Sequence, residues 1–149
     1  MEIKVGEGVA GYIKAIEMMG KFSFRDGVYQ PVEISPTAKE IKRIAWNKTR
    51  MKECFHNAAT AVSALHYRGI AAYYVTGFAA SVIPLEHAWI AVGPHWYDLT
   101  WEKFSDLGKE YVPIYTLAVD QLMEFVLDNH GYAPTPYDIM NITRRRDHG

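Results

Sequence analysis

The segment from Cys54 to Arg68 constrains the fold of this chain more than any other. Its apolar residues repeat at the spacing of a helix face, and Gly69 follows as a terminator. Apolar groups occupy much of the helix circumference, so we expect a central, largely buried helix. Four small residues let other elements approach it closely: Ala58, Ala59, Ala61 and Ala64.

The residues that follow this helix have the character of β-strands. Alternating, aromatic and β-branched residues predict strands at Ile70–Ala79, Glu86–Val92, His95–Thr100 and Tyr111–Leu117. Pro84 marks Ser81–Leu85 as a loop, and Gly93-Pro94 predicts a tight hairpin turn. Pro113 indicates an edge strand or a bulge.

Further helices are predicted on both sides of these segments. The first spans Val9–Met19. The second is capped by Ser35, has Pro36 at its first position and ends near Trp46. Two more are expected, at Asp120–His130 and in a short segment after Pro136. Lys21–Ile34 is either a weak hairpin at Asp26-Gly27 or an irregular connection, and residues 144–149 are expected to fray. The order predicts an α+β fold in which a central helix packs on an antiparallel sheet. We expect one domain over residues 1–149, with its core at about 36–118 and a C-terminal helix at about 120–130.

Composition and charge exclude several classes of partner. A formal charge of -1 gives no electrostatic reason to expect nucleic acid or an anionic membrane. No segment approaches the roughly 18 to 20 apolar residues of a membrane span, and the N-terminus lacks the pattern of a signal peptide. One cysteine with scattered histidines does not supply a metal site, and no cofactor is expected. The sequence therefore predicts a cytoplasmic protein.

Cys54, His87 and Asp98 occur in the order of a nucleophile, its base and the group that orients the base. Cys54 opens the central helix, where unpaired N–H groups and the helix dipole stabilise a thiolate. A two-residue hairpin loop places Val92 opposite His95. Continued along the strands, this register sets Trp89 opposite Asp98 and His87 opposite Thr100, all on one face. Asp98 is then a diagonal neighbour of His87, at roughly 7 to 8 Å between backbones.

An oxyanion formed by attack of Cys54 on a carbonyl needs hydrogen-bond donors nearby. The backbone N–H of Cys54 is the obvious one. Four further residues are candidates for oxyanion or substrate binding: Asn47, Trp46, Asn57 and Trp89.

Several motifs support this assignment in order and spacing. They are Cys54 with Ala58 on its helix, Arg68-Gly69-Ile70-Ala71-Ala72, Gly77-Phe78, His87-Ala88-Trp89, and Trp96-Tyr97-Asp98-Leu99-Thr100-Trp101. In these motifs the chain resembles the transglutaminase-like superfamily, a branch of the papain-like cysteine enzymes, and in particular its small stand-alone bacterial and phage members. Leu99 stands where that family usually has proline. The resemblance implies a papain-like fold, with Cys54 as nucleophile, His87 as general base and acid, and Asp98 as orienter.

The expected activity is thiol-dependent acyl transfer on an amide or peptide bond of a protein or peptide, through a thioester. Hydrolysis is favoured over transamidation because so small a chain has little room for a second-substrate domain. The alternative is a catalytically inactive domain that binds a peptide or host protein in its cleft. A purely structural role requires an occluded Cys54 and an exposed apolar face elsewhere. The sequence does not define the oligomeric state.

Overall fold

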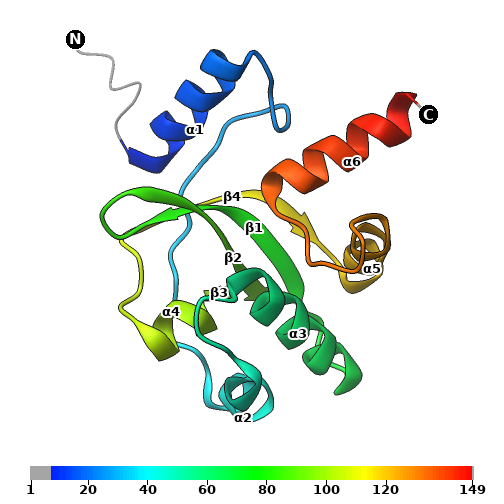
Figure 1. The fold of residues 1–149 in the computed structure, drawn as a ribbon. Coiled ribbons are helices and arrows are strands. Elements are labelled where there is room, and N and C mark those ends of the chain that lie inside the picture. The colour runs from blue at the N-terminus through cyan, green and yellow to red at the C-terminus, as the bar shows by residue number, and fades with distance from the viewer. Residues whose placement is uncertain (1–7, 149) are drawn as a thin grey trace.

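The computed structural model describes residues 8–148, which form one four-stranded antiparallel sheet with helices around it (Figure 1). The strand order is β3-β2-β1-β4. The strands are β1 (Tyr73–Ala80), β2 (Pro84–Val92), β3 (His95–Tyr97) and β4 (Glu110–Leu117). The helices are α1 (Gly8–Gly20), α2 (Lys39–Ala45), the 3-10 helix η1 (Trp46–Lys48), α3 (Cys54–Tyr67), α4 (Leu99–Phe104), α5 (Val119–Asp128) and α6 (Pro136–His148). The predicted α+β class is confirmed.

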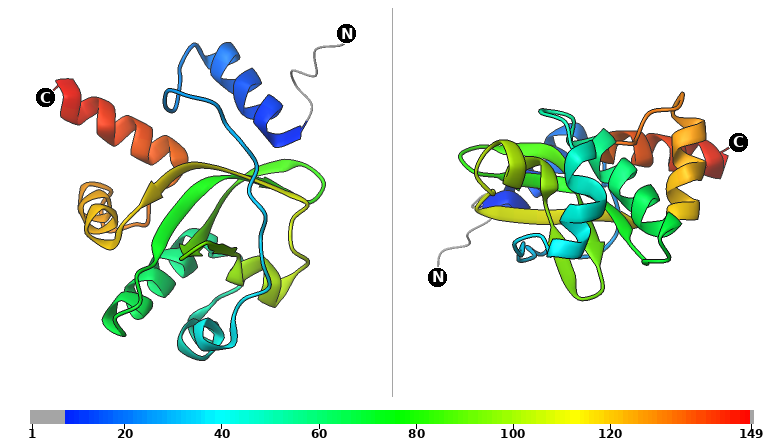
Figure 2. Two further views of the ribbon diagram at one scale, coloured as in Figure 1. Left: turned by 180° about the vertical axis from the view of Figure 1, so that it is seen from behind. Right: turned by 90° about the horizontal axis from the view of Figure 1, so that it is seen from below.

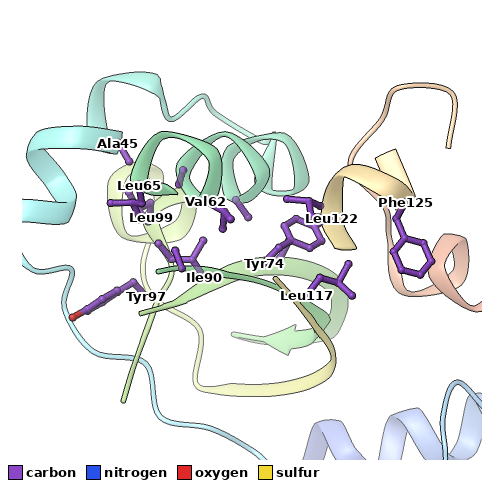
Figure 3. Packing of buried hydrophobic residues seen from close by; sticks show 14 of the residues in the cluster. Ala45, Val62, Leu65, Tyr74, Ile90, Tyr97, Leu99, Leu117, Leu122 and Phe125 are labelled. Carbon is purple, nitrogen blue, oxygen red and sulfur yellow. The ribbon is translucent and has the colours of Figure 1, made fainter. Parts of the chain in front are cut away.

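Helix α3 covers one face of the sheet, as its apolar pattern predicts. Val62 and Leu65 on this helix are fully buried and belong to one cluster with Tyr74 of β1 and Ile90 of β2 (Figure 3). Residues of α2, α4, α5 and α6 extend the same cluster at its margins. Burial of large side chains at about 25 cal/mol per Å² of apolar surface makes this cluster the main source of stability.

The opposite face of the sheet is covered by the extended chain between α1 and α2, which crosses it in the left panel of Figure 2. Val32 donates its backbone N–H to the Tyr111 carbonyl (2.8 Å), and Ser35 donates to the Trp96 carbonyl (2.9 Å). Residues 21–34 are thus an irregular connection with isolated bridges, and no hairpin forms there. Ala38 is the N-cap of α2, which begins at Lys39, so the prediction that Ser35 caps this helix with Pro36 at its first position was wrong.

A second cluster lies where α1 packs on β1 and β4. Val9 and Ile13 are buried against Phe78, Val112 and Ile114. The predicted helix Val9–Met19 therefore matches α1 to within one residue at each end.

The hairpin of β2 and β3 has the predicted register, with Val92 opposite His95. The pairing stops at Tyr97, however, because Asp98 accepts the N–H of Trp101 and becomes the N-cap of α4. The predicted strand His95–Thr100 was therefore wrong beyond Tyr97, and the predicted cross-strand pairs of Asp98 and Thr100 do not form. The Ser81–Leu85 loop is also shorter than predicted, since β2 begins at Pro84.

Strand β4 confirms the prediction made from Pro113, in both of its alternatives. It lies at the edge of the sheet, and its register with β1 shifts between Thr76 and Gly77, where Gly77 pairs with Pro113. A Cβ atom on Gly77 would lie 2.2 Å from the Val112 carbonyl oxygen, so only glycine allows this close approach.

The C-terminal segment is a regular helix. Thr135 and Asp138 cap α6 reciprocally: Asp138 donates its N–H to the Thr135 hydroxyl (3.1 Å), and Thr135 donates its own to the Asp138 carboxylate (3.0 Å). Near the other end, Arg146 pairs with Asp128 at 2.8 Å and lies over the Phe125 ring. Residues 144–148, where fraying is predicted, continue α6, and Gly149 lies outside the described residues. Within the described part of the chain, no helix is long and apolar enough to cross a membrane.

Candidate active site

His87 and Asp98 form a buried pair. The His87 side chain on β2 is 1% exposed, and its Nε2 donates to Asp98 Oδ2 at a distance of 2.8 Å. Asp98 itself has no exposed surface. Since Nε2 is taken by the carboxylate, Nδ1 is the ring nitrogen left for chemistry.

Three donors hold the Asp98 carboxylate in place. Besides His87, the Tyr111 hydroxyl donates to Oδ2 (2.6 Å) and the Trp101 backbone N–H donates to Oδ1 (3.2 Å). Tyr111 is in turn held by the N–H of Gly108, which donates to its hydroxyl oxygen (2.9 Å). A carboxylate fixed on both oxygens orients the imidazole with little freedom. Tyr111 is a positioning residue that the sequence analysis missed.

Cys54 is the first residue of α3 and lines the same pocket as His87. β3 pairs only with Ile90–Val92, so among the described residues β2 has no neighbouring strand on that side at His87. The hydrogen-bond ladder of α3 starts with Asn57 N–H to the Glu53 carbonyl (2.8 Å), which leaves the first N–H groups of the helix without a helical acceptor. Cys54 is partly exposed and not occluded.

The environment of His87 favours its charged form. Burial lowers its pKa, but hydrogen bonds to Asp98 and to Cys54, together with the negative charges of both, outweigh burial and raise the pKa from 6.5 to about 9. The Trp101 ring stacks on the imidazole with centroids 3.9 Å apart, an arrangement that also suits a cation. At neutral pH the resting His87 is therefore an imidazolium.

The pocket next to Cys54 and His87 has a volume of about 310 Å³. Its lining combines apolar and polar side chains: Met51, Lys52, Cys54, Leu85, Glu86, His87, Thr100, Trp101, Phe104 and Ser105. Burial is the main cause that raises the pKa of Glu86 above its ordinary value, and Oε1 of this residue is buried without a hydrogen-bond partner in residues 8–148. The pocket thus brings the Cys54 thiol and the His87 imidazole next to an apolar wall.

Asn57 is placed close to the site but its amide is fully used. Its Nδ2 donates to the Arg50 carbonyl (2.6 Å) and to the Thr100 hydroxyl (3.0 Å), while its Oδ1 accepts the Arg50 N–H (2.9 Å). An amide nitrogen has two hydrogens, so none is left for an oxyanion. Asn57 instead ties the turn before α3 to α4.

The other three candidates for oxyanion or substrate binding lie away from the pocket. Trp46 packs under the Lys42 and Lys103 ammonium groups, at 4.6 and 5.8 Å from its ring centroid. Asn47 lines a separate groove of about 830 Å³ between α2, α3 and α5. Trp89 is buried behind His87. The structure therefore brings together Cys54, His87 and Asp98, but none of these three auxiliary residues.

Comparison with models of protein families, with curated proteins and with solved structures finds no match to this chain. Within residues 8–148, no group of three or more His, Cys, Asp or Glu side chains could hold a metal ion.

Proposed function

We propose that this protein is a transglutaminase-like cysteine enzyme that hydrolyses an amide or peptide bond through a Cys54–His87–Asp98 triad. One observation carries the proposal: a buried His87 is fixed on one nitrogen by Asp98, and its other side faces a partly exposed thiol at a helix N-terminus. A nucleophile, a base and an orienting group in this arrangement define an acyl-transfer site.

The first half of the reaction forms a thioester. The Cys54 sulfur attacks the carbonyl carbon, and the resulting oxyanion lies against the free N–H groups of the first turn of α3. His87 holds the proton that the thiol has given up and passes it from Nδ1 to the leaving nitrogen as the carbon–nitrogen bond breaks. The amine departs neutral, and the acyl group stays on sulfur.

The second half releases the acyl group. Neutral His87 takes a proton from water, the hydroxide adds to the thioester carbon, and the thiolate leaves as the carboxylic acid forms. Asp98 stabilises each imidazolium that appears and keeps the ring from turning, because the carboxylate itself is held by Tyr111 and Trp101. An amine in place of water gives transamidation by the same steps.

The order of elements supports assignment to the papain-like fold: the nucleophile opens a central helix, His87 follows on a strand, and Asp98 follows the next strand. A free thiol is also the form expected in a reducing compartment, which supports the proposed cytoplasmic location.

The decisive experiment is the pH dependence of Cys54 alkylation by iodoacetamide. Cys54 is the only cysteine, so intact mass reports its adduct directly. The wild type should react well below the ordinary thiol pKa of about 8.5, and His87→Gln should slow the reaction at pH 6 by about tenfold or more. His66→Gln, an exposed histidine on the same helix, is the matched control and should match the wild type.

Turnover is tested with p-nitrophenyl acetate, which should give a burst of nitrophenol and an acetylated Cys54 that then hydrolyses. An ordinary thiol profile that His87→Gln leaves unchanged contradicts the enzyme proposal and favours an inactive domain that binds a peptide or host protein.

A further inference from the structure

The pocket beside Cys54 has an apolar wall that acyl transfer itself does not require. Met51, Leu85 and Phe104 line it while remaining 61%, 50% and 36% exposed, and Trp101 completes the wall. They belong to separate segments: the turn before α3, strand β2 and helix α4. Exposed apolar side chains that converge from separate segments on one pocket are typical of a binding surface.

The charges in this pocket do not favour a charged ligand. Lys52 and Glu86 are the charged side chains among its lining residues besides His87, and they have opposite signs. A charged substrate side chain would lose water against the apolar wall without a dedicated partner.

The size of the pocket fits one bulky side chain and its adjoining backbone. Its volume of about 310 Å³ lies at the lower end of the range of small-ligand sites, about 300 to 1,000 Å³. A pocket of this volume has room for several water molecules. The four apolar side chains of the wall offer these waters few hydrogen bonds, so a ligand whose apolar group displaces them binds more tightly.

We infer that this pocket selects substrates that carry a bulky apolar side chain, of the size of leucine or phenylalanine, next to the reacting carbonyl. The inference rests on the proposed function and names the substrate class of the same site. Leu85 and Phe104 are its specificity-determining residues, since both face the pocket and neither contributes to the His87–Asp98 pair.

The test uses small chloroacetamides, in which the Cys54 sulfur displaces chloride and the group on the amide nitrogen lies close to the reacting carbon. N-isobutyl and N-benzyl chloroacetamide are compared with the N-(2-aminoethyl) and N-(2-carboxyethyl) compounds. Each rate, followed by intact mass, is divided by the rate of the same compound with mercaptoethanol. The apolar compounds should react with Cys54 about ten times faster than the charged ones on this corrected scale.

Leu85→Ser and Phe104→Ser should each reduce this preference several-fold, with every rate expressed relative to iodoacetamide in the same variant. Met123→Ser is the matched control, because Met123 has a similar exposed fraction, 47%, but lies on α5, away from the pocket. It should keep the wild-type preference.

Equal corrected rates for apolar and charged compounds would overturn the inference, as would a preference that both pocket variants retain. Either result leaves the proposed function intact if iodoacetamide still shows a His87-dependent reaction at low pH. Loss of that dependence instead defeats the proposed function, and the two failures are therefore distinguishable.

Discussion

Raising the pH should remove a defined part of the stability of this protein, because protonation of His87 is coupled to folding. The pKa of His87 rises from 6.5 to about 9 in the folded state. Each pKa unit corresponds to about 1.4 kcal/mol, and the side chain is almost fully buried, so the charged form stabilises the fold by about 3 kcal/mol. The stabilisation is fully present below pH 6.5 and is lost as the pH rises through 9.

Urea unfolding at pH 6.0 and pH 9.3 measures this loss. With a urea m-value of about 1 to 3 kcal/mol per molar, the unfolding midpoint should fall by about 1 to 3 M between the two conditions. The upper pH stays below the ordinary tyrosine pKa of about 10, so that the buried tyrosines, whose pKa values are raised further, remain protonated.

His87→Gln is the control, since it keeps a polar side chain but cannot titrate. The other histidines are the same in both proteins, so the difference between the two midpoint shifts isolates His87 together with the Cys54 thiol that interacts with it. If wild type and His87→Gln lose stability equally between these pH values, the pairing of His87 with Asp98 does not raise its pKa and the argument is refuted.

Three further changes test the supports of the site. Asp98→Asn should return the pKa of His87 from about 9 toward its ordinary 6.5, which NMR titration of the imidazole C–H signals measures directly; an unchanged pKa contradicts the role of Asp98. Tyr111→Phe should cost about 1.5 to 3 kcal/mol in urea unfolding, because a buried carboxylate loses one of three donors, whereas the exposed Tyr132→Phe should have no effect. Gly77→Ala should destabilise the fold by about 1 to 3 kcal/mol or more, since its Cβ would lie 2.2 Å from the Val112 carbonyl oxygen. A thermal midpoint equal to that of the wild type would contradict this, because it would show that β4 can shift away without loss of stability.

Patterns of residues that are close together in the sequence correctly predicted several elements of the fold. The helix from Cys54 ends within one residue of its predicted limit because small apolar residues and Gly69 define it in the sequence alone. The same applies to the hairpin register at Gly93-Pro94. Two missed signals were also local: Thr135 followed three residues later by Asp138 is a capping box, and Asp98 precedes α4 as an N-cap.

The remaining features depend on contacts between distant residues. Ser35 has a good capping side chain, but its backbone N–H is drawn to Trp96 of β3, and this pairing outweighs local preference. Tyr111 reaches Asp98 only because β4 joins the sheet beside β1. The pairing of His87 with Asp98 was correctly anticipated, although the route differs: the carboxylate comes from a helix cap and not from a paired strand.

Asp98 both holds the His87 imidazole and caps helix α4, so the His87–Asp98 pair depends on the first turn of this helix. Helix α4 has only six residues, too few to persist without its cap. When this turn opens locally, the Trp101 amide loses Asp98 and becomes free to exchange its proton with solvent, and the carboxylate that holds His87 loses one of its three donors. The exchange rate of the Trp101 amide proton therefore reports how often the turn that positions Asp98 opens.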